Sequence, residues 1–239
     1  MFTFPVGFFG GTGDPYWSNV VLYLPLTGTN GQTTFTDVSQ YGHAVTRNGD
    51  TVISTAQAPA LTGVNSSLYL DGSGDYLSIA NNTAFQLGTG DFTVRFFWRG
   101  SAVGSYTMIV GTILSNFNQA NTWRIGNRFN SLNSTYFART TGSGVQEPVY
   151  STNINDGNWH YVLVRRVSGM ISYFVDGNQL TPSSGSESIP GDLTTSNELR
   201  VGYNQLDSAY VQGYLSHLQI YKGVGIAGTS VPTVPYPIG

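Results

Sequence analysis

Short runs rich in Val, Ile, Tyr, Phe and Thr, separated by Gly, Asn, Asp and Ser, extend along almost the whole chain. Helical spacing of apolar residues is almost absent, whereas apolar and polar residues alternate within many of the runs. Many short strands with frequent turns are typical of antiparallel sheets and not of a parallel sheet. The pattern predicts an all-β sandwich or barrel with strands near 20–26, 33–36, 43–47, 67–71, 75–80, 91–99, 107–114, 122–127, 134–140, 158–167, 170–176, 198–203 and 213–221.

The most regular stretch is residues 155–180, with the sequence NDGNWHYVLVRRVSGMISYFVDGNQL. Both faces of 159–166 are largely apolar through the middle, as expected for a central strand that is covered on both sides. The Asp-Gly pair at 176–177 supplies the two positive-φ residues of a tight two-residue hairpin turn. Positions on a strand within a sheet also explain Trp159 and His160. We therefore interpret this pair as framework and not as a catalytic constellation.

Charged residues make up only 10% of the 239 residues, and thirteen acids against ten bases leave a net charge of −3. The bases are nine scattered arginines and Lys222, so no basic patch favours nucleic-acid binding. The chain has no cysteine, which excludes thiol catalysis, disulfides and thiolate metal sites. No apolar run approaches the ~20 residues of a membrane span, so we expect no membrane insertion.

The two ends of the chain differ from the rest. Residues 1–17 combine aromatic residues and glycines with no strand pattern, and residues 225–239 are rich in proline. Sandwiches of this length commonly form one domain, so we predict an N-terminal arm (1–17), one sandwich domain (18–224) and a C-terminal tail (225–239). The N-terminus lacks a basic region and carries Pro5, so we expect no signal peptide.

An ordered aromatic arm packs either on its own domain or on a neighbouring molecule, and we expect a neighbour. On the strand near 91–99, Arg95, Phe97 and Arg99 share the face opposite the apolar one. Arginine and aromatic residues are enriched at interfaces, but arginine stems that cover Phe97 on a solvated face explain the pattern equally well. The predicted assembly contacts are Phe2, Phe4, Phe8, Phe9, Tyr16, Trp17, Arg95, Phe97 and Arg99.

Four blocks of sequence follow one another in a recognisable order: SSLYLDGSGDYLSI at 66–79, GTGDFTVRFFWRG at 88–100, the hairpin at 155–180, and ELRVGYNQLDSAYVQGYLSHLQIYKGV at 198–224. Together they resemble laminin-G-like domains, and the resemblance covers about residues 18–224. The opening DPYWSNVVLYLPL and the proline-rich end are similar to versions of this domain in bacteriophage tail and virion proteins. The resemblance implies a concanavalin A-like jelly-roll sandwich of two antiparallel sheets, sugar binding and a place in a virion.

Glycoside hydrolases of this jelly roll place their two carboxylates on a strand with the pattern E-x-D-x-x-E. None of the three glutamates of this chain lies in such a strand, and the ten aspartates lie at turns or strand ends. No G-x-S-x-G elbow and no paired histidine at metal spacing is present. We therefore predict no catalytic residues and no enzymatic activity, with a glycoside hydrolase as an alternative.

Many members of the resembled family bind calcium at the rim of the sandwich, where Asp37, Asp71, Asp75 and Asp207 would supply oxygen ligands. The closing strand departs from the family pattern, because Ser216-His217 replaces an Asp-Glu pair. Two oxygen ligands are thereby lost. We predict no cofactor and no metal site, with calcium as the one ion that the resemblance leaves open.

Sugar-binding sites combine aromatic faces with the amide and charged groups that bind hydroxyls. Two segments, 116–139 and 203–210, offer such residues. Trp123 also alternates with Ile125 in the way that core residues of a strand do. The predicted carbohydrate-binding residues are Trp123, Arg124, Asn127, Tyr203, Asn204, Asp207 and Tyr210.

These observations predict a non-enzymatic structural, decoration or tail-associated protein of a virion, made in the host cytoplasm. Its expected partners are other virion proteins, further copies of itself in a homo-oligomer, and a cell-surface glycan. A free-standing carbohydrate-binding module is the alternative.

Overall fold

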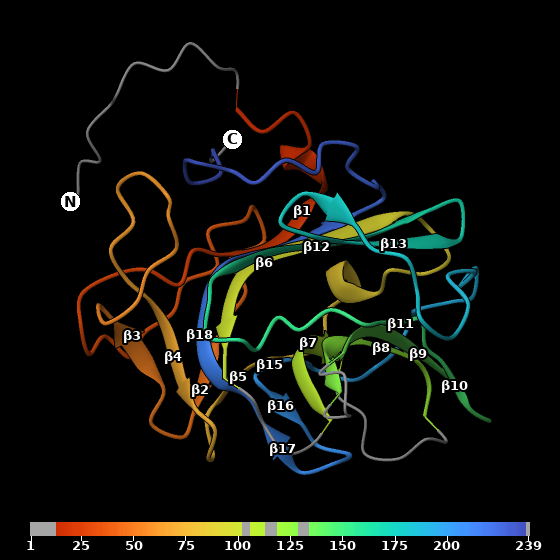
Figure 1. Ribbon diagram of the computed structural model, residues 1–239, viewed down its shortest axis with the longest axis horizontal. Helices are drawn as coiled ribbons and strands as arrows, with labels where there is room; N and C mark the ends of the chain where they lie inside the picture. The colour runs from red at the N-terminus through yellow and green to blue at the C-terminus, as the bar shows by residue number, and fades with distance from the viewer. Residues whose placement is uncertain (1–12, 102–105, 113–118, 129–133, 238–239) are drawn as a thin grey trace.

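Two antiparallel sheets face each other across one apolar core in the computed structural model (Figure 1). The structure describes residues 13–101, 106–112, 119–128 and 134–237. Within these ranges every strand pair is antiparallel, and the helical elements are two short 3-10 turns, η1 (Trp17–Asn19) and η2 (Thr83–Phe85). No helix of this part of the chain has the length and hydropathy to cross a membrane. The predicted all-β sandwich of two antiparallel sheets is confirmed.

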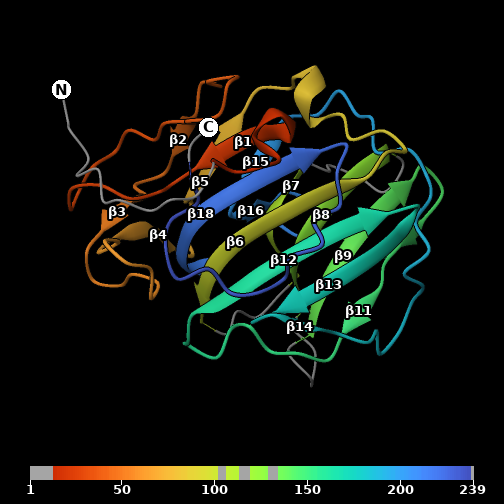
Figure 2. The ribbon, with the colours of Figure 1, turned by 90° about the horizontal axis from the view of Figure 1, so that it is seen from above.

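The first large sheet, sheet I, holds the longest strand of the protein, β18, and Figure 2 shows β18, β6, β12 and β13 side by side. β1 (Val20–Leu24) pairs with β18 outside the main order. The main order is β14 (Asn178–Gln179), β13 (Met170–Val175), β12 (His160–Val167), β6 (Phe92–Gly100), β18 (Gln212–Lys222), β4 (Ser67–Asp71) and β3 (Val52–Ser54).

Sheet II lies on the other side of the core, and β11 (Val149–Tyr150) pairs with its strand β9 outside the main order. A two-stranded ribbon, β16 (Tyr203–Asn204) and β17 (Ala209–Tyr210), lies on the side of sheet II that faces away from the core (Figure 1). The main order of sheet II is β10 (Val145–Gln146), β9 (Ser134–Thr141), β8 (Ala120–Arg128), β7 (Thr107–Thr112), β15 (Leu199–Val201), β5 (Tyr76–Ile79) and β2 (Thr46–Asn48).

One face of each long strand points into the core. On β6, Val94, Phe96 and Trp98 point into it and are almost completely buried, as the alternation in 91–99 predicts. A second apolar cluster, the outer cluster, lies on the opposite face of sheet I and includes Phe97 and Tyr161. β12 is therefore covered on both faces, as its sequence predicts.

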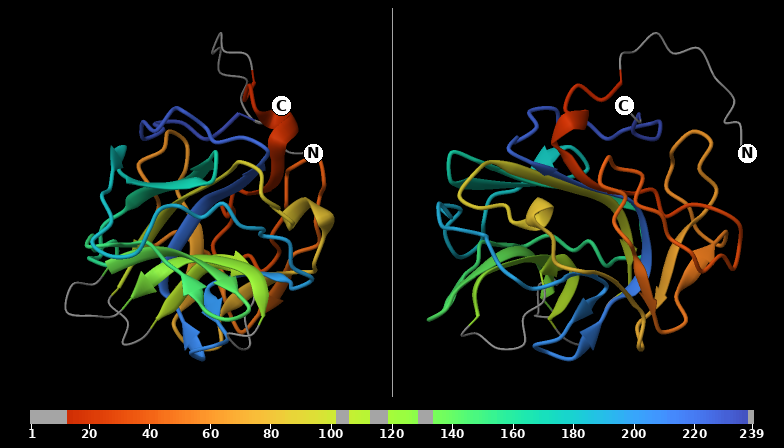
Figure 3. Two further views of the ribbon diagram at one scale, coloured as in Figure 1. Left: turned by 90° about the vertical axis from the view of Figure 1, so that its right-hand side faces the viewer. Right: turned by 180° about the vertical axis from the view of Figure 1, so that it is seen from behind.

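Residues 13–19 and the tail from residue 223 to 237 lie over the outward face of sheet I (Figure 3), which is the face of the outer cluster. From the tail, Ile226 and Tyr236 are buried in it, and from the arm, Tyr16 and Trp17 pack against it. Tyr16 and Trp17 of the arm thus pack on their own domain, because the outward face of sheet I offers them apolar surface, and packing of the arm on a neighbour stays a prediction. The predicted contacts Phe2, Phe4, Phe8 and Phe9 lie outside the described residues.

Two tight hairpin turns follow the sequence prediction. Ser168 and Gly169 have φ values of 50° and 79°, and Asp176 and Gly177 have φ values of 51° and 83°. In each case the two flanking residues pair directly, so each loop has two residues and the positive φ values that such loops require. The predicted strand at 33–36 is wrong, since its only ladder contact is a single bridge from Thr36.

A bulge interrupts β18 at His217. The pairing of β18 with β6 shifts register between Ser216 and Gln219, and His217 has a φ of 53° while its N–H donates to the carbonyl of Pro25 at 3.0 Å. The side chain is 2% exposed, and burial lowers the pKa of His217 from 6.5 to about 4.

This histidine predicts a pH dependence of stability. Between pH 6.5 and 4 the unfolded chain binds a proton at this position and the folded protein does not, so the free energy of unfolding falls as pH falls, by about 3 kcal/mol over the full window. Urea unfolding at pH 7 and pH 4.5 measures the change. His217→Asn, which tolerates the positive φ, is expected to weaken the dependence. An unchanged slope in this variant would contradict the assignment.

Candidate functional site

A pocket of about 560 Å³ opens beside the β16–β17 ribbon, on the outer side of sheet II. Its volume falls within the roughly 300–1,000 Å³ of small-molecule sites. The pocket brings together Arg124 and Asp207, which the sequence predicted in two separate sugar-binding segments. Its main lining residues are Tyr106, Arg124, Arg128, Glu147, Leu206 and Asp207.

Arg124 is the most unusual residue of the pocket. It stands on β8 between Trp123 and Ile125, whose side chains point into the core, so its own side chain points outward. The side chain is only 5% exposed, and Nη2 lies 3.9 Å from Oε2 of Glu147. Nε and Nη1 have no hydrogen-bond partner in the described part of the chain. These two nitrogens are themselves buried, so Arg124 supplies a fixed positive charge to the wall of the pocket.

Glu147 lies between two arginines. Its Oε1 is 3.1 Å from Nη1 of Arg128, and the guanidinium of Arg128 lies over the ring of Tyr106, with 4.7 Å from Cζ to the ring centroid. Burial raises the pKa of Glu147, the guanidiniums of Arg128 and Arg124 oppose the rise, and Asp207 adds to it. The pocket therefore already contains one carboxylate of its own beside its two cations.

The ribbon holds Asp207 at the edge of the pocket. Asn204, which is buried, donates from Nδ2 to Oδ2 of Asp207 at 2.6 Å and to the carbonyl of Tyr106 at 3.0 Å. Its Oδ1 accepts from the N–H of Leu206 at 3.2 Å. These bonds fasten the β16–β17 turn to the start of β7. Asn204 is thus a positioning residue of the pocket, and Asp207 is the residue that faces it.

Three tyrosines form a half-buried platform on the other side of the ribbon. The rings of Tyr203 and Tyr210 stack at 4.4 Å between centroids, and Tyr76 of β5 lies 5.1 Å from Tyr203. The guanidinium of Arg200 lies 4.8 Å from the ring of Tyr76 and 5.2 Å from that of Tyr203. The predicted aromatic residues of segment 203–210 therefore lie at the surface, where a sugar can stack on them.

The structure corrects two of the predicted sugar-binding residues. Trp123 is completely buried and stacks on Phe92 in the core, with 6.4 Å between centroids, so its indole has no face for a sugar. Asn127 is 3% exposed and donates to Oδ1 of Asn155 at 3.2 Å, which also accepts from the indole of Trp98. Both side chains make their contacts in the interior, and neither lines the pocket.

The list of predicted sugar-binding residues omits Tyr106, Arg128, Glu147 and Leu206, although Arg128 lies in the predicted segment 116–139. Arg128 follows Arg124 by four positions on β8, so the period of two places both side chains on one face and would have indicated it. Glu147 gives no comparable signal, because the neighbouring strands β10 and β11 have only two residues each.

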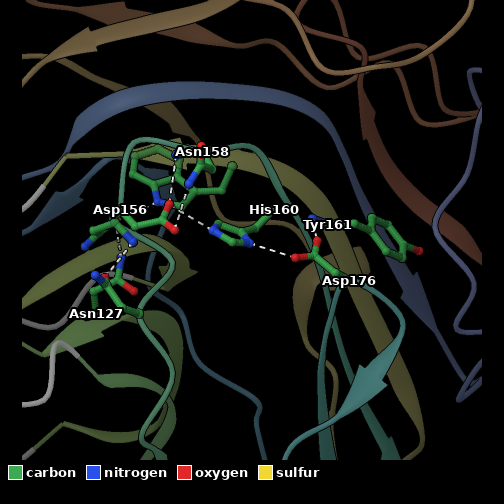
Figure 4. Close-up of polar contacts among 9 residues, drawn as sticks. Asn127, Asp156, Asn158, His160, Tyr161 and Asp176 are labelled. Carbon is green, nitrogen blue, oxygen red and sulfur yellow. Dashed lines mark hydrogen bonds and ion pairs between the residues drawn. The ribbon is translucent and has the colours of Figure 1, made fainter.

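His160 lies between two carboxylates, as Figure 4 shows. Its Nδ1 is 2.8 Å from Oδ2 of Asp176, and its Nε2 is 3.1 Å from Oδ1 of Asp156. Asp176 also accepts from the N–H of Tyr161 at 2.8 Å, and Asp156 accepts from the N–H of Asn158 at 2.8 Å. These contacts fasten the loop before β12 to the hairpin turn after β13, which agrees with a framework role.

The predicted calcium ligands do not form one site. Both oxygens of Asp37 accept hydrogen bonds from neighbouring N–H groups. Asp71 and Asp75 lie with Asp50 in a group whose ligand atoms are within 4.8 Å of one another. The two oxygens of Asp75, however, accept from the N–H groups of Asp50 and Asp71 at 2.8 and 3.1 Å, so turn geometry accounts for the cluster. The four predicted aspartates therefore do not converge on one ion, since only Asp71 and Asp75 lie together in such a group.

The predicted assembly residues of β6 have partners within the chain. Arg95 donates from Nε to Oε1 of Gln219 at 2.8 Å, pairs with Asp14 at 3.3 Å and lies under the ring of Tyr236 at 3.7 Å. Phe97 is 4% exposed, and Arg99 is half-buried at the surface. The arm and tail therefore cover Arg95 and Phe97, and a role of these residues in assembly stays a prediction.

Comparison with known proteins identifies the family. The family model described as the concanavalin A-like lectin/glucanases superfamily matches residues 71–225, which is more than half of the chain. The chain belongs to this superfamily, and the resemblance to its laminin-G-like domains is confirmed. No curated protein matches the sequence.

Solved structures of this fold include bacterial toxin domains. The binding domain of Paraclostridial Mosquitocidal Protein 1 has a TM-score of 0.64 and 12% identity over 88% of this chain and 50% of that one. The botulinum neurotoxin serotype G binding domain has a TM-score of 0.62 and 13% identity over 87% and 49%. The serotype D ligand binding domain, in complex with N-acetylneuraminic acid, has a TM-score of 0.58 and 13% identity over 88% and 49%. The chain spans about half the length of these domains, and the likeness is one of fold.

Proposed function

We propose that this protein is a non-enzymatic adhesion module that binds a cell-surface glycan in the pocket around Arg124 and Asp207. The observation that carries the proposal is the pocket of about 560 Å³, where the partly exposed guanidinium of Arg128 and the exposed Asp207 are available to a ligand. Sugar hydroxyls accept hydrogen bonds from guanidiniums and donate them to carboxylates. The serotype D toxin domain of the same fold, which is in complex with N-acetylneuraminic acid, supports a glycan as the ligand class.

A glycoside hydrolase is the function to separate from binding, because Glu147 and Asp207 line the same pocket. The sequence did not predict this arrangement, and hydrolysis needs two carboxylates across a sugar. Burial raises the pKa of Glu147, as a proton donor requires, but its two carboxylate oxygens already face the guanidiniums of Arg128 and Arg124 at 3.1 and 3.9 Å. Asp207 is bound to the amide of Asn204. The arrangement supports binding in preference to bond cleavage.

Glycan-array binding followed by calorimetry on the best glycan tests the proposal. Arg128→Ala removes a pocket cation whose side chain is 29% exposed, so the fold tolerates the change. We expect the Kd of this variant to be at least tenfold higher, a loss of about 1.4 kcal/mol of binding free energy. The unmodified protein should release no reducing sugar. Lys222→Ala is the matched control, with an unchanged Kd, because it removes a cation of sheet I that donates to the carbonyl of Thr83 in η2. Equal affinity of both variants, or turnover that Glu147→Gln abolishes, would refute the proposal.

We further propose that the module belongs to a virion, where the arm and tail attach it to another copy or to another virion protein. The sequence resemblance to phage tail and virion domains supports this, as do four phenylalanines before residue 13. Val231 and Val234 of the tail are 41% and 42% exposed, and a groove of about 370 Å³ lies between the tail and Tyr16. Deletion of residues 1–12 tests the attachment by light scattering. The expected result is unchanged thermal stability with loss of the multimer, and an unchanged mass in solution would defeat it.

A further inference from the structure

We propose that the pocket selects neutral sugars and discriminates against sugars that carry a carboxylate or sulfate. This inference rests on the proposed function and assigns the ligand class of the same site. Two guanidiniums and two carboxylates line the pocket, so their charges cancel. A net cationic pocket would favour an acidic sugar, and this pocket is not one.

Glu147 occupies the position that an acidic ligand would need. It lies 3.1 Å from Arg128 and 3.9 Å from Arg124, so the cation best placed to pair with a ligand carboxylate already has a carboxylate partner. An acidic sugar would have to displace Glu147, which is well buried, or share the arginines with it. Two like charges that share one site repel each other.

Asp207 is a second reason to expect that the pocket disfavours an acidic sugar. Its Oδ2 accepts from the amide of Asn204, and its Oδ1 has no hydrogen-bond partner among the described residues. A sugar hydroxyl donates to such an oxygen, whereas an ionised carboxylate has no proton to donate and is repelled by it. Asp207 also contributes to the raised pKa of Glu147, so the two carboxylates already act on each other.

A neutral sugar satisfies both kinds of group at once. Each hydroxyl is a donor and an acceptor, so one hydroxyl accepts from the guanidinium of Arg128, whose side chain is 29% exposed, while its neighbour donates to Asp207. Neither bond requires Glu147 to leave its arginines. The pocket therefore has donors and acceptors for a neutral polyol, whereas the arginine that would bind an acidic sugar is already paired with Glu147.

The test compares paired glycans, each neutral oligosaccharide beside the same oligosaccharide with one terminal sialic acid, on an array and then by calorimetry. We expect the neutral member to bind at least about tenfold more tightly. Glu147→Gln removes the resident charge and should reduce this preference at least fivefold, mainly by strengthening the acidic member. Asp207→Asn, at an exposed position, should act in the same direction and does not depend on a buried site.

Glu198→Gln is the matched control, because Glu198 pairs with Arg200 at 2.6 Å outside the pocket and its loss should leave the preference unchanged. Tighter binding of the acidic member by the unmodified protein overturns the inference and leaves the proposed function intact. An unchanged preference in both Glu147→Gln and Asp207→Asn also overturns the inference. Absence of binding to either member of any pair overturns the proposed function together with it.

Discussion

Arg166→Met is expected to lower the free energy of unfolding by about 3–5 kcal/mol. Arg166 is completely buried, and among the described residues its hydrogen-bond partners are backbone carbonyls. Its guanidinium donates to the carbonyls of Gly88, Gly90, Ile189 and Gly191, at distances from 2.5 to 3.4 Å. Methionine keeps much of the apolar stem and removes every donor, so several buried carbonyls lose their partner at about 1–3 kcal/mol each.

Arg166 connects two loops that are distant in sequence, the segment before β6 and the segment near Ile189. The neighbouring Arg165→Met is the matched control. Arg165 points to the opposite face, where it makes one hydrogen bond to the carbonyl of Ile226 at 2.6 Å and lies over the ring of Phe174. We expect its loss to cost about 1 kcal/mol. Urea unfolding of both variants measures the difference, and equal midpoints would show that water replaces the Arg166 guanidinium.

This pair of arginines shows what the sequence can predict. The alternation in 159–166 placed the two side chains on opposite faces of a central strand, and the Asp-Gly and Ser-Gly turns located both hairpin ends. These features depend on residues that are adjacent or nearly adjacent, so local rules suffice. The carbonyls that Arg166 binds lie more than twenty positions away, and no local pattern indicates them.

The residues of the pocket also separate into those that the sequence can indicate and those that it cannot. Arg124 and Asp207 were predictable as candidates because their residue types suit sugar hydroxyls. Their proximity depends on the β16–β17 ribbon folding over sheet II, and Glu147 joins them through two strands too short to recognise. Trp123 was assigned to sugar binding on residue type, although its alternation with Ile125 already favoured the core face. Where residue type and periodicity disagree on a strand, periodicity decides burial.

Tyr236→Ala is expected to lower the free energy of unfolding by about 3–5 kcal/mol, the cost of deleting a buried aromatic side chain. Tyr236 is 6% exposed in the outer cluster, with Tyr23 at 6.1 Å between ring centroids. Its ring lies 3.7 Å from Cζ of Arg95, whose Nη2 also pairs with Asp14 of the arm at 3.3 Å. Loss of the ring therefore uncovers apolar surface and removes a cation–π contact.

Val234→Ala is the matched control in the same tail, because Val234 is 42% exposed and should change stability by less than about 0.5 kcal/mol. Thermal and urea unfolding of the two variants decide whether the tail is part of the folded domain. If Tyr236→Ala costs less than about 1 kcal/mol, the tail does not stay on sheet I in solution. Arg95 and Phe97 would then be uncovered, and the face predicted from the sequence as an assembly surface would be available to a partner. A cost near 4 kcal/mol instead means that the tail stays on sheet I, with Val231 and Val234 as its exposed apolar side chains.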